Sequence, residues 1–309
     1  MDKDYGETDG RSRVQDSVKA AAEAWAKNPA KSGGLVVSEA VMQLRLPFLE
    51  DAHAVPNAFL RAALFPALSS SEKRPFVQEK PVFSVGSLRV TFTGEQFDQT
   101  DLDVLTALFE VGSTRELGDQ FTFSAYSLLK RLGRTTGGKD YSWLHRALVR
   151  LRGGTIEVFD KANLFFGGFI EGGVGNRARK EYTIRINPDL GALFGFDCWS
   201  QVDREQRRVL GKNSTAKVLH GYYSSHVNPG AHRYEVLGQI VGLKSRRMAG
   251  MKRTLIKAHE ALKSDECGFL TGFEAGSETI LVHKAEQTVS QQRHARRRRP
   301  SKLPKNVMK

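Results

Sequence analysis

Cysteine is almost absent from this sequence. The 309 residues include two, Cys198 and Cys267, and these do not form a C-x-x-C pair. Their scarcity excludes a disulfide framework and a cysteine-ligated zinc site, and it is typical of a reducing compartment. Long apolar runs are also missing, because no stretch approaches the ~18 residues needed to cross a bilayer. The N-terminus is acidic and does not look like a signal peptide, so we expect a cytoplasmic protein.

Residue patterns for catalysis are equally scarce. The eight histidines are scattered, and no His-hydrophobe-His triplet accompanies a tyrosine, as it does in rolling-circle nicking enzymes. No acidic cluster suits a two-metal site. Residues 133–139 nearly match a phosphate-binding loop, but Asp140 stands where a magnesium-binding hydroxyl is required, and a helical pattern precedes the loop instead of a buried strand. The sequence therefore predicts no enzyme, no metal and no cofactor.

Positive charge is what the sequence has in excess. Its 47 Lys and Arg residues against 34 Asp and Glu give a formal net charge of +13, and the pI is about 9.8. Residues 284–309 alone hold nine Lys or Arg and a single acid, Glu286. Such a field attracts phosphate backbones and gives salt-sensitive affinity without sequence preference. We expect a polyanion-binding protein whose basic tail is disordered when free.

The most informative segment is a basic amphipathic helix predicted over residues 245–263, with Ser245 as its N-cap. Apolar residues recur at three- and four-residue steps on one face: Met248, Met251, Leu255, Ala258 and Leu262. The opposite face is basic: Arg246, Gly250, Arg253 and Lys257, flanked by Arg247 and Lys252. This pattern suits the major groove of DNA, although an ordinary solvated surface helix has it too. Gly250 costs about 1 kcal/mol relative to alanine in mid-helix, which is explained if the backbone approaches DNA there.

A second candidate helix covers residues 141–152 and begins after Asp140, its predicted N-cap. Three leucines form its apolar face: Leu144, Leu148 and Leu151. The remaining surface carries groups that can contact DNA: Tyr141, Ser142, His145, Arg146 and Arg150, with Arg134 and Lys139 in the preceding turn. An ordinary surface helix is again the alternative.

The order of predicted elements repeats along the chain. After strands at 82–85 and 88–93, the first half has a helix from about residue 101, a strand at 121–123, helices at 124–131 and 141–152, and strands at 155–159, 164–170 and 182–186. The second half has helices at 203–210 and 214–225, a short strand and helix within 232–241, the 245–263 helix, and strands at 269–273 and 279–283. Helix, strand, two helices and a closing strand pair is the order of a winged helix, whose last hairpin is called the wing.

The predicted fold is therefore an α+β protein with two tandem winged-helix domains. We place the domains at residues 56–188 and 189–284. A flexible N-terminal arm and linker, residues 1–55, precede them, and the basic tail, residues 285–309, follows.

The linker contains one short motif. Gln43, Leu46 and Phe48 match the Q-x-x-L-x-F peptide by which bacterial proteins dock on the polymerase sliding clamp. The two apolar side chains would fill a pocket while Gln43 bonds to its rim, and a flexible segment can adopt the bound shape at modest ordering cost.

Several segments together resemble the plasmid replication initiators of the TrfA type. They are residues 60–65 (Leu-Arg-Ala-Ala-Leu-Phe), 90–94 (Val-Thr-Phe-Thr-Gly), 121–124 (Phe-Thr-Phe-Ser) with 128–133, and 223–226 (Tyr-Ser-Ser-His). Their order and spacing extend the resemblance over roughly residues 43–263. It implies two winged-helix domains, binding to direct repeats (iterons) at a plasmid origin, recruitment of host replication proteins, and a dimer–monomer equilibrium. Family members also carry a Gln-Leu-x-Leu-Phe clamp-binding peptide ahead of the first domain, where Gln43 to Phe48 stand here. Pro47, between Leu46 and Phe48, departs from that pattern.

We therefore predict a protein that binds specific duplex DNA and starts plasmid replication without catalysing a reaction. The predicted DNA-binding residues are Arg134, Lys139, Tyr141, Ser142, His145, Arg146, Arg150, Ser245, Arg246, Arg247, Gly250, Lys252, Arg253 and Lys257. The tail and wing are expected to hold phosphates. The main alternative is a transcriptional regulator that uses the same helices, and a nicking enzyme is a more distant one.

Overall fold

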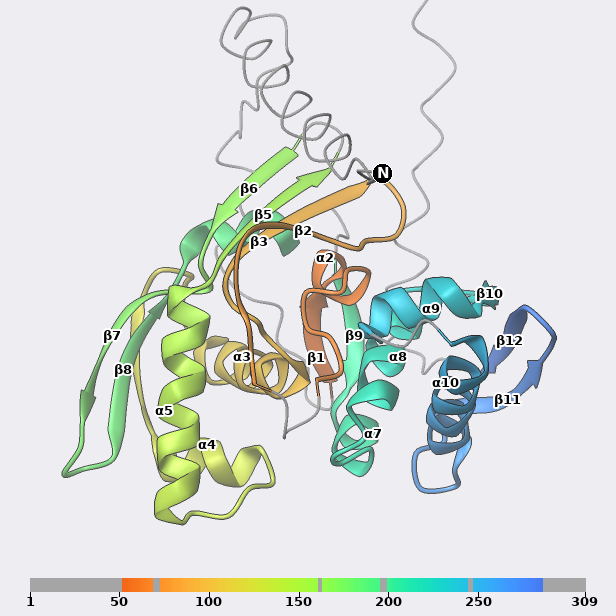
Figure 1. Ribbon diagram of the computed structural model, residues 1–309. Coiled ribbons are helices and arrows are strands. Elements are labelled where there is room, and N and C mark those ends of the chain that lie inside the picture. The colour runs from red at the N-terminus through yellow and green to blue at the C-terminus, as the bar shows by residue number, and fades with distance from the viewer. Residues whose placement is uncertain (1–51, 69–72, 161–162, 195–198, 244–246, 286–309) are drawn as a thin grey trace, which may run out of the picture. The chain divides into compact units, whose positions relative to one another are not determined.

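The computed structural model describes residues 52–68, 73–160, 163–194, 199–243 and 247–285 (Figure 1). The chain divides into two compact units, Met1–Val41 and Met42–Lys309, and every described residue belongs to the second. No helix within the described ranges is long and apolar enough to cross a membrane. The clamp-like motif at 43–48, the tail from residue 286, and the predicted DNA contacts Ser245 and Arg246 lie outside the described residues.

Three helices and a small sheet make up most of the first half. The elements are α3 (Gln99–Gly112), β4 (Gln120–Ser124), α4 (Ala125–Arg131), α5 (Gly138–Gly153), β7 (Ile170–Asn176) and β8 (Glu181–Ile186). The strands are antiparallel in the order β4-β8-β7. Helix α3 begins at a capping box, in which the Asp98 carboxylate accepts from the Asp101 N–H and the Asp101 carboxylate accepts from the Asp98 N–H. Ser124 caps α4 as predicted, accepting from the Ser127 N–H.

A separate antiparallel sheet lies above this group in Figure 1. It has the order β2-β3-β5-β6, from β2 (Phe76–Val82), β3 (Leu88–Glu95), β5 (Thr155–Asp160) and β6 (Asn163–Gly167). The single strand predicted at 164–170 is therefore wrong, because β6 and β7 belong to different sheets. The chain leaves β6 at Gly167, whose φ of 156° favours glycine. A Cβ at this position would lie 2.8 Å from the Asn187 amide nitrogen, so the turn has no room for a side chain.

The second half repeats the element order of the first. Its elements are α8 (Ser214–Ser224), β10 (Gly230–Arg233), α9 (Tyr234–Val241), α10 (Met248–Lys263), β11 (Leu270–Ala275) and β12 (Thr279–Lys284). The strand order β10-β12-β11 matches β4-β8-β7, since the last strand pairs with both others in each case. Element order and strand pairing thus agree between the two halves.

Shorter elements join these two groups. They are β1 (Ala52–Pro56), α2 (Asn57–Leu60), η2 (Pro188–Leu190), α6 (Gly191–Phe194), β9 (Trp199–Asp203) and α7 (Arg204–Val209). Strand β1 pairs antiparallel with β9, from Ala52 opposite Asp203 to Pro56 opposite Trp199. Most of β1 falls within the predicted linker, so pairing with a strand almost 150 positions later was not foreseen.

An aromatic cluster forms the centre of the first core. Phe59, Phe65, Phe92, Phe97 and Phe169 are buried and in ring contact. The C-terminal end of α5 rests on it at residue 154, because a Cβ added to that glycine would overlap the Phe97 ring and lie 3.0 Å from Phe92. The aromatic cluster thus fixes the end of the helix that carries the first candidate DNA surface.

The second core is built around the helices of the second half. It includes Tyr222, Tyr234, Leu237 and Leu255, all buried. Among the described residues, the first cluster extends to Val202 and the second starts at Leu210. The domain limits at 188 and 189 stay a prediction.

Candidate nucleic-acid interface

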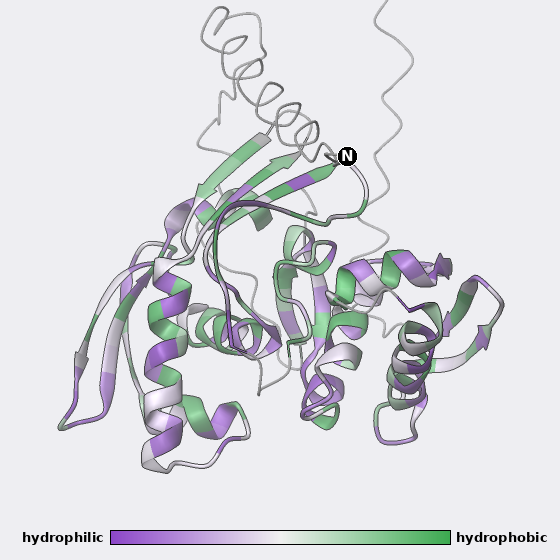
Figure 2. Cartoon of the chain, in the orientation of Figure 1, coloured by the Kyte–Doolittle hydropathy of each residue, from purple (hydrophilic) through white to green (hydrophobic). Residues whose placement is uncertain are grey.

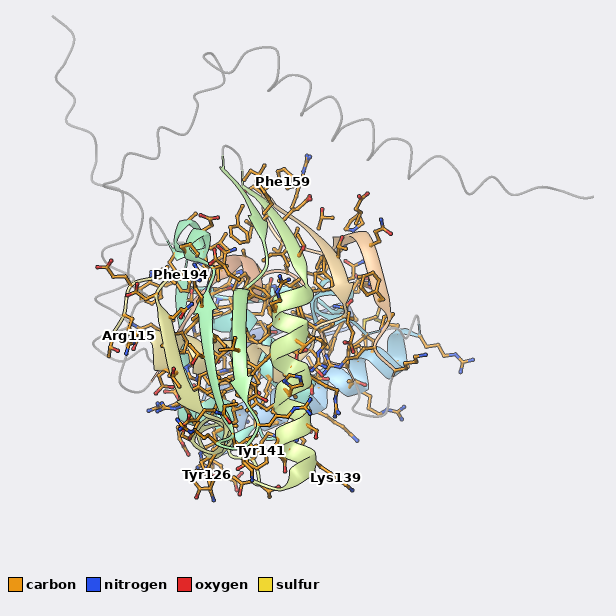
Figure 3. All side chains as sticks on the ribbon, turned by 90° about the vertical axis from the view of Figure 1, so that its left-hand side faces the viewer. Arg115, Tyr126, Lys139, Tyr141, Phe159 and Phe194 are labelled. Atoms are coloured by element: carbon orange, nitrogen blue, oxygen red, sulfur yellow. The ribbon has the colours of Figure 1, made fainter. Side chains whose placement is uncertain are left out.

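Helix α5 has a buried apolar face and, opposite it, an exposed polar face. Leu144, Leu148 and Leu151 are buried as predicted. Lys139, Ser142, His145 and Arg146 are exposed on the other side. In Figure 3, Lys139 and Tyr141 lie at the end of α5 near Tyr126 of α4.

The turn before α5 is held by its own side chains. The Arg134 guanidinium stacks 3.8 Å from the Trp143 ring centre and forms an ion pair with Asp140 at 3.0 Å. Hydrogen bonds from Thr135, and then from Arg134, lower the pKa of Asp140. The helix begins at Gly138 with Gly137 as N-cap, so the prediction that Asp140 is the N-cap was wrong. Arg134 therefore orders this turn, and its guanidinium is already engaged in the DNA-free protein.

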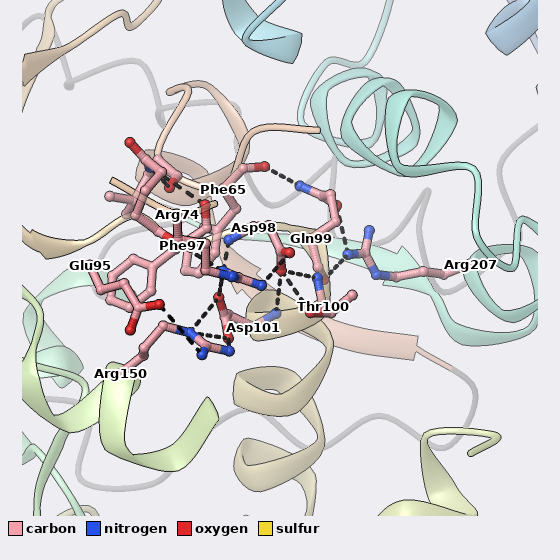
Figure 4. Close-up of polar contacts among 12 residues, drawn as sticks. Phe65, Arg74, Glu95, Phe97, Asp98, Gln99, Thr100, Asp101, Arg150 and Arg207 are labelled. Atoms are coloured by element: carbon pink, nitrogen blue, oxygen red, sulfur yellow. Dashed lines mark hydrogen bonds and ion pairs between the residues drawn. The ribbon is translucent and has the colours of Figure 1, made fainter. Parts of the chain in front are cut away.

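Arg150 is not on the exposed side of α5. It is 8% exposed, and its Nη2 lies 2.8 Å from Oδ1 of Asp101 on α3 (Figure 4). The same carboxylate also forms an ion pair with Arg74, whose Nη1 lies 2.7 Å from Asp101 Oδ2. The predicted DNA contact through Arg150 is corrected, because its place beside Ala147 and Leu151 turns the side chain toward α3, where an acid balances its charge.

The β7–β8 hairpin extends the basic surface next to α5. Its tip carries Arg177, Arg179 and Lys180, all exposed, and Figure 2 shows this tip as hydrophilic. The Lys180 Nζ lies 4.3 Å from the centre of the Tyr141 ring. Sequence reasoning expected the wing to hold phosphates but named none of these residues. The signal was present, as three basic residues within four positions directly after Gly175 and Asn176, which favour turns.

A second contact ties the hairpin to α5. The Tyr182 hydroxyl on β8 lies 3.3 Å from His145 Nδ1, and the two rings stack with centres 6.0 Å apart. Tyr141 and His145 therefore both contact the hairpin. We interpret them mainly as residues that hold α5 and the basic tip in one surface.

Helix α10 also has the predicted two faces. Leu255, Ala258 and Leu262 are buried in the second core, while Arg253 and Lys257 are exposed. The helix begins at Met248, with Arg247 at the N-cap position and no side-chain cap. The predicted N-cap at Ser245 was therefore two residues too early. Arg247 is exposed at the N-terminal end.

Gly250 lies in the first turn of α10 and not in its middle. Its carbonyl accepts a hydrogen bond from the Thr254 hydroxyl at 3.0 Å, and it is half-buried. The cost of glycine is smaller at a helix end than in the interior, so the argument for close DNA approach is weaker than the sequence indicated.

Lys252 has a structural partner. Its Nζ donates a hydrogen bond to the Ser277 carbonyl in the β11–β12 turn and lies 5.1 Å from the Tyr234 ring centre. Lys252 thus holds α10 against this hairpin, as Tyr141 and His145 hold α5 against the other.

The two hairpins differ in charge. The β11–β12 tip carries Glu274 and Glu278, both exposed, where the β7–β8 tip carries three cations. Carboxylates repel phosphates, so only the first hairpin suits the phosphate contact expected of a wing.

Comparison with known proteins assigns the family. A profile of the TrfA protein matches residues 12–270 of this chain. The chain belongs to the TrfA family. A curated relative, the plasmid replication initiator protein TrfA of Escherichia coli, is 26% identical over 240 residues, which are 72% of this chain and 60% of that protein. The match thus spans less than two thirds of the relative's length. The resemblance seen in the sequence is confirmed at the level of the family.

Two solved structures are partly similar to this TrfA-family chain. Domains 2 and 3 of RctB align with a TM-score of 0.49 and 12% identity, covering 75% of this chain and 99% of that one. The Pi initiator protein in complex with iteron DNA aligns with a TM-score of 0.45 and 11% identity, covering 60% and 92%.

Two adjacent tyrosines on α8, which a nicking enzyme could use only if they reached DNA, are core residues in this TrfA-family protein. Tyr222 and Tyr223 are 1% and 0% exposed. Burial raises the pKa of both hydroxyls, that of Tyr223 well above its usual value. The Tyr223 hydroxyl bonds to His259 Nε2 at 2.8 Å. A nucleophile must reach the DNA backbone, and neither hydroxyl has that access.

Proposed function

We propose that this chain is a plasmid replication initiator that binds iterons, the direct repeats at an origin. Family membership supports the class. The observation that carries the proposal is that both halves share one element order and one strand pairing, and that each presents an exposed basic helix, α5 or α10.

We infer that both halves are winged helices, with α5 and α10 as the helices that enter the major groove. Exposed side chains on the two helices would face base edges: Lys139, Ser142 and Arg146 on α5, and Arg247, Arg253 and Lys257 on α10. Arginine can bond guanine in two places, contributing ~1–3 kcal/mol of discrimination for each good pair. The β7–β8 tip would hold phosphates, which position the protein without reading sequence.

Base reading and phosphate contact are separated by two substitutions. We expect Arg253→Ala to reduce the preference for the native repeat over one with a single changed base by about 5- to 150-fold. We expect Arg179→Ala to weaken binding to every duplex alike and to lower the salt slope by about 1. Fluorescence anisotropy with both duplexes at several salt concentrations measures both effects.

Arg115→Ala is the matched control. Arg115 is also exposed and lies apart from Lys139 in Figure 3, so its loss should leave preference and salt slope near the wild-type values. If Arg253→Ala kept full sequence preference and changed only the salt dependence, base reading by α10 would be wrong.

We also propose that binding opens A·T-rich DNA next to the repeats. A transcriptional regulator with the same helices should bind without melting. Permanganate reactivity of thymines on a supercoiled plasmid carrying the repeats distinguishes the two: new reactive thymines on binding favour the initiator, whereas binding without them favours the regulator. A dimer–monomer equilibrium, as the resemblance implies, belongs to the same proposal.

We propose finally that the chain recruits the bacterial sliding clamp through Gln43, Leu46 and Phe48. We expect the double substitution Leu46→Ala/Phe48→Ala to weaken clamp binding by the full chain at least ~10-fold, because both pocket-filling side chains are lost. Arg45→Ala, inside the same segment but at a position that the motif leaves open, is the control. Surface plasmon resonance on immobilised clamp measures both, and equal binding by the two variants would exclude this motif as the docking site.

A further inference from the structure

A buried ionic group joins the two halves of the chain. Asp103 lies on α3. Its Oδ1 is 2.5 Å from Nε of Arg207 on α7, and its Oδ2 is 2.9 Å from Nζ of Lys217 on α8. The Arg207 side chain is 5% exposed and that of Lys217 is 12% exposed. Burial alone would raise the pKa of Asp103, but the two cations outweigh it and lower that pKa. The carboxylate is therefore held ionised between elements of different halves.

Arg207 makes further bonds across the same boundary. Its Nη2 donates to Gln99 Oε1, at the start of α3, at 2.7 Å (Figure 4). Gln99 in turn donates to the Phe65 carbonyl at 2.5 Å, and Arg207 Nη1 donates to the Lys217 carbonyl at 3.3 Å. One guanidinium thus connects α3 of the first half with α8 of the second.

Close backbone packing accompanies these charges. The Ala67 N–H donates to the Val241 carbonyl at 2.8 Å. A Cβ at Gly221 of α8 would lie 2.9 Å from Leu60, and one at Gly242 would lie 2.5 Å from Pro66. The halves therefore meet at several separate points, and the ionic group adds the charged contacts that hold them in one orientation.

We infer that Asp103, Arg207 and Lys217 are positioning residues that set which spacing between two DNA segments the protein accepts. This inference rests on the proposed function, in which α5 and α10 each read one segment. Each base pair inserted between the segments moves them about 3.4 Å apart and rotates them by about 35°. Helices fixed to one rigid body cannot follow that change, whereas helices on loosely joined halves can.

Spacing tolerance tests the inference. The two segments are located on the native repeat by hydroxyl-radical footprinting, and one, two or three base pairs are inserted between them. We expect the full-length wild type to lose about 100-fold in affinity on a single insertion, because one helix loses its base contacts. Asp103→Asn should lose about tenfold or less on the same insertion. Lys217→Met should be intermediate, and it is safe for folding because it leaves Asp103 paired with Arg207.

Glu205→Gln is the matched control, since it also removes one carboxylate but from the exposed Glu205–Arg208 pair within α7; it should keep the wild-type insertion penalty. A purely structural role for Asp103 would lower affinity for every spacing equally. An unchanged insertion penalty in both Asp103→Asn and Lys217→Met, or a wild type that binds the expanded sites as well as its own, would overturn the inference while leaving iteron binding intact. Failure of the wild type to prefer its native repeat at all would overturn both.

Discussion

Lowering the pH from 7.5 to 5 should destabilise the folded protein by at least about 4 kcal/mol. His220 and His259 are fully buried, and burial lowers the pKa of His220 to about 3 and that of His259 to about 4. The unfolded chain, with histidine pKa values near 6.5, binds these protons first, so stability is complete above about pH 6.5 and is lost as the pH falls toward 4. At pH 5 each group contributes about 2 kcal/mol of that loss.

Burial makes these histidines resist protonation, and their hydrogen bonds fix which ring nitrogen carries the single proton. His259 Nδ1 donates to the Leu255 carbonyl at 2.7 Å, so Nε2 must accept from the Tyr223 hydroxyl. His220 Nε2 bonds to Gln206 Oε1 at 3.0 Å, and its Nδ1 has no hydrogen-bond partner among the described residues. A second proton on His220 would lie at Nδ1, which has no acceptor among the described residues, and one on His259 would require the Tyr223 hydroxyl to change from donor to acceptor. His53 and His226, whose pKa values burial lowers to about 4, act in the same direction.

Urea unfolding at pH 7.5, 6 and 5 measures this effect. His259→Gln should be less stable at pH 7.5 but should have a shallower dependence on pH, because one proton fewer distinguishes the folded from the unfolded chain. A pH slope identical to that of the wild type would show that His259 does not take part.

Asp101→Asn should lower the free energy of unfolding by about 3–5 kcal/mol. Asp101 is 0% exposed and is the acid that neutralises Arg150. Without it, the ion pair that Arg150 keeps among the described residues is a 4.0 Å contact to Glu95. A buried guanidinium without a counter-charge is costly, and its hydrogen bonds to water cannot be restored. For a chain of this size each kcal/mol corresponds to about 2–4 °C in Tm, so thermal unfolding detects the loss readily.

Two companion variants make this result interpretable. Arg208→Ala removes an exposed pair with Glu205 and should leave the thermal unfolding temperature close to that of the wild type, because exposed pairs contribute little to stability. The double substitution Asp101→Leu/Arg150→Met removes both buried charges and should recover much of the loss. A loss in the double variant as large as in Asp101→Asn would mean that shape and capping at Asp101, and not charge balance, dominate.

The sequence predicted elements well where local periodicity determines structure. The inward faces of α5 and α10 follow from Leu144, Leu148, Leu255 and Leu262, because a three- and four-residue spacing leaves little choice of side. Helix ends were less predictable. Gly137 replaced Asp140 as the N-cap, since the carboxylate had a better partner in the adjacent turn.

Two of the predicted DNA contacts have partners inside the protein that the sequence does not reveal. Arg150 and Lys252 look like DNA contacts in sequence, but their partners are Asp101, 49 positions earlier, and the Ser277 carbonyl, 25 positions later. Local patterns contain no information on such distant partners. The same limit explains why the pairing of β1 with β9 and the Asp103 group were not foreseen.

The aromatic contact at the end of α5 has a consequence for how this chain can vary. Position 154 accepts no side chain while a phenylalanine occupies position 97, since even a methyl group would overlap that ring. A descendant with alanine at 154 must therefore carry a smaller residue at 97, or lose the fit of the helix to the core. The two positions are expected to change together, although 57 residues separate them, and a set of related sequences would reveal them as a covarying pair.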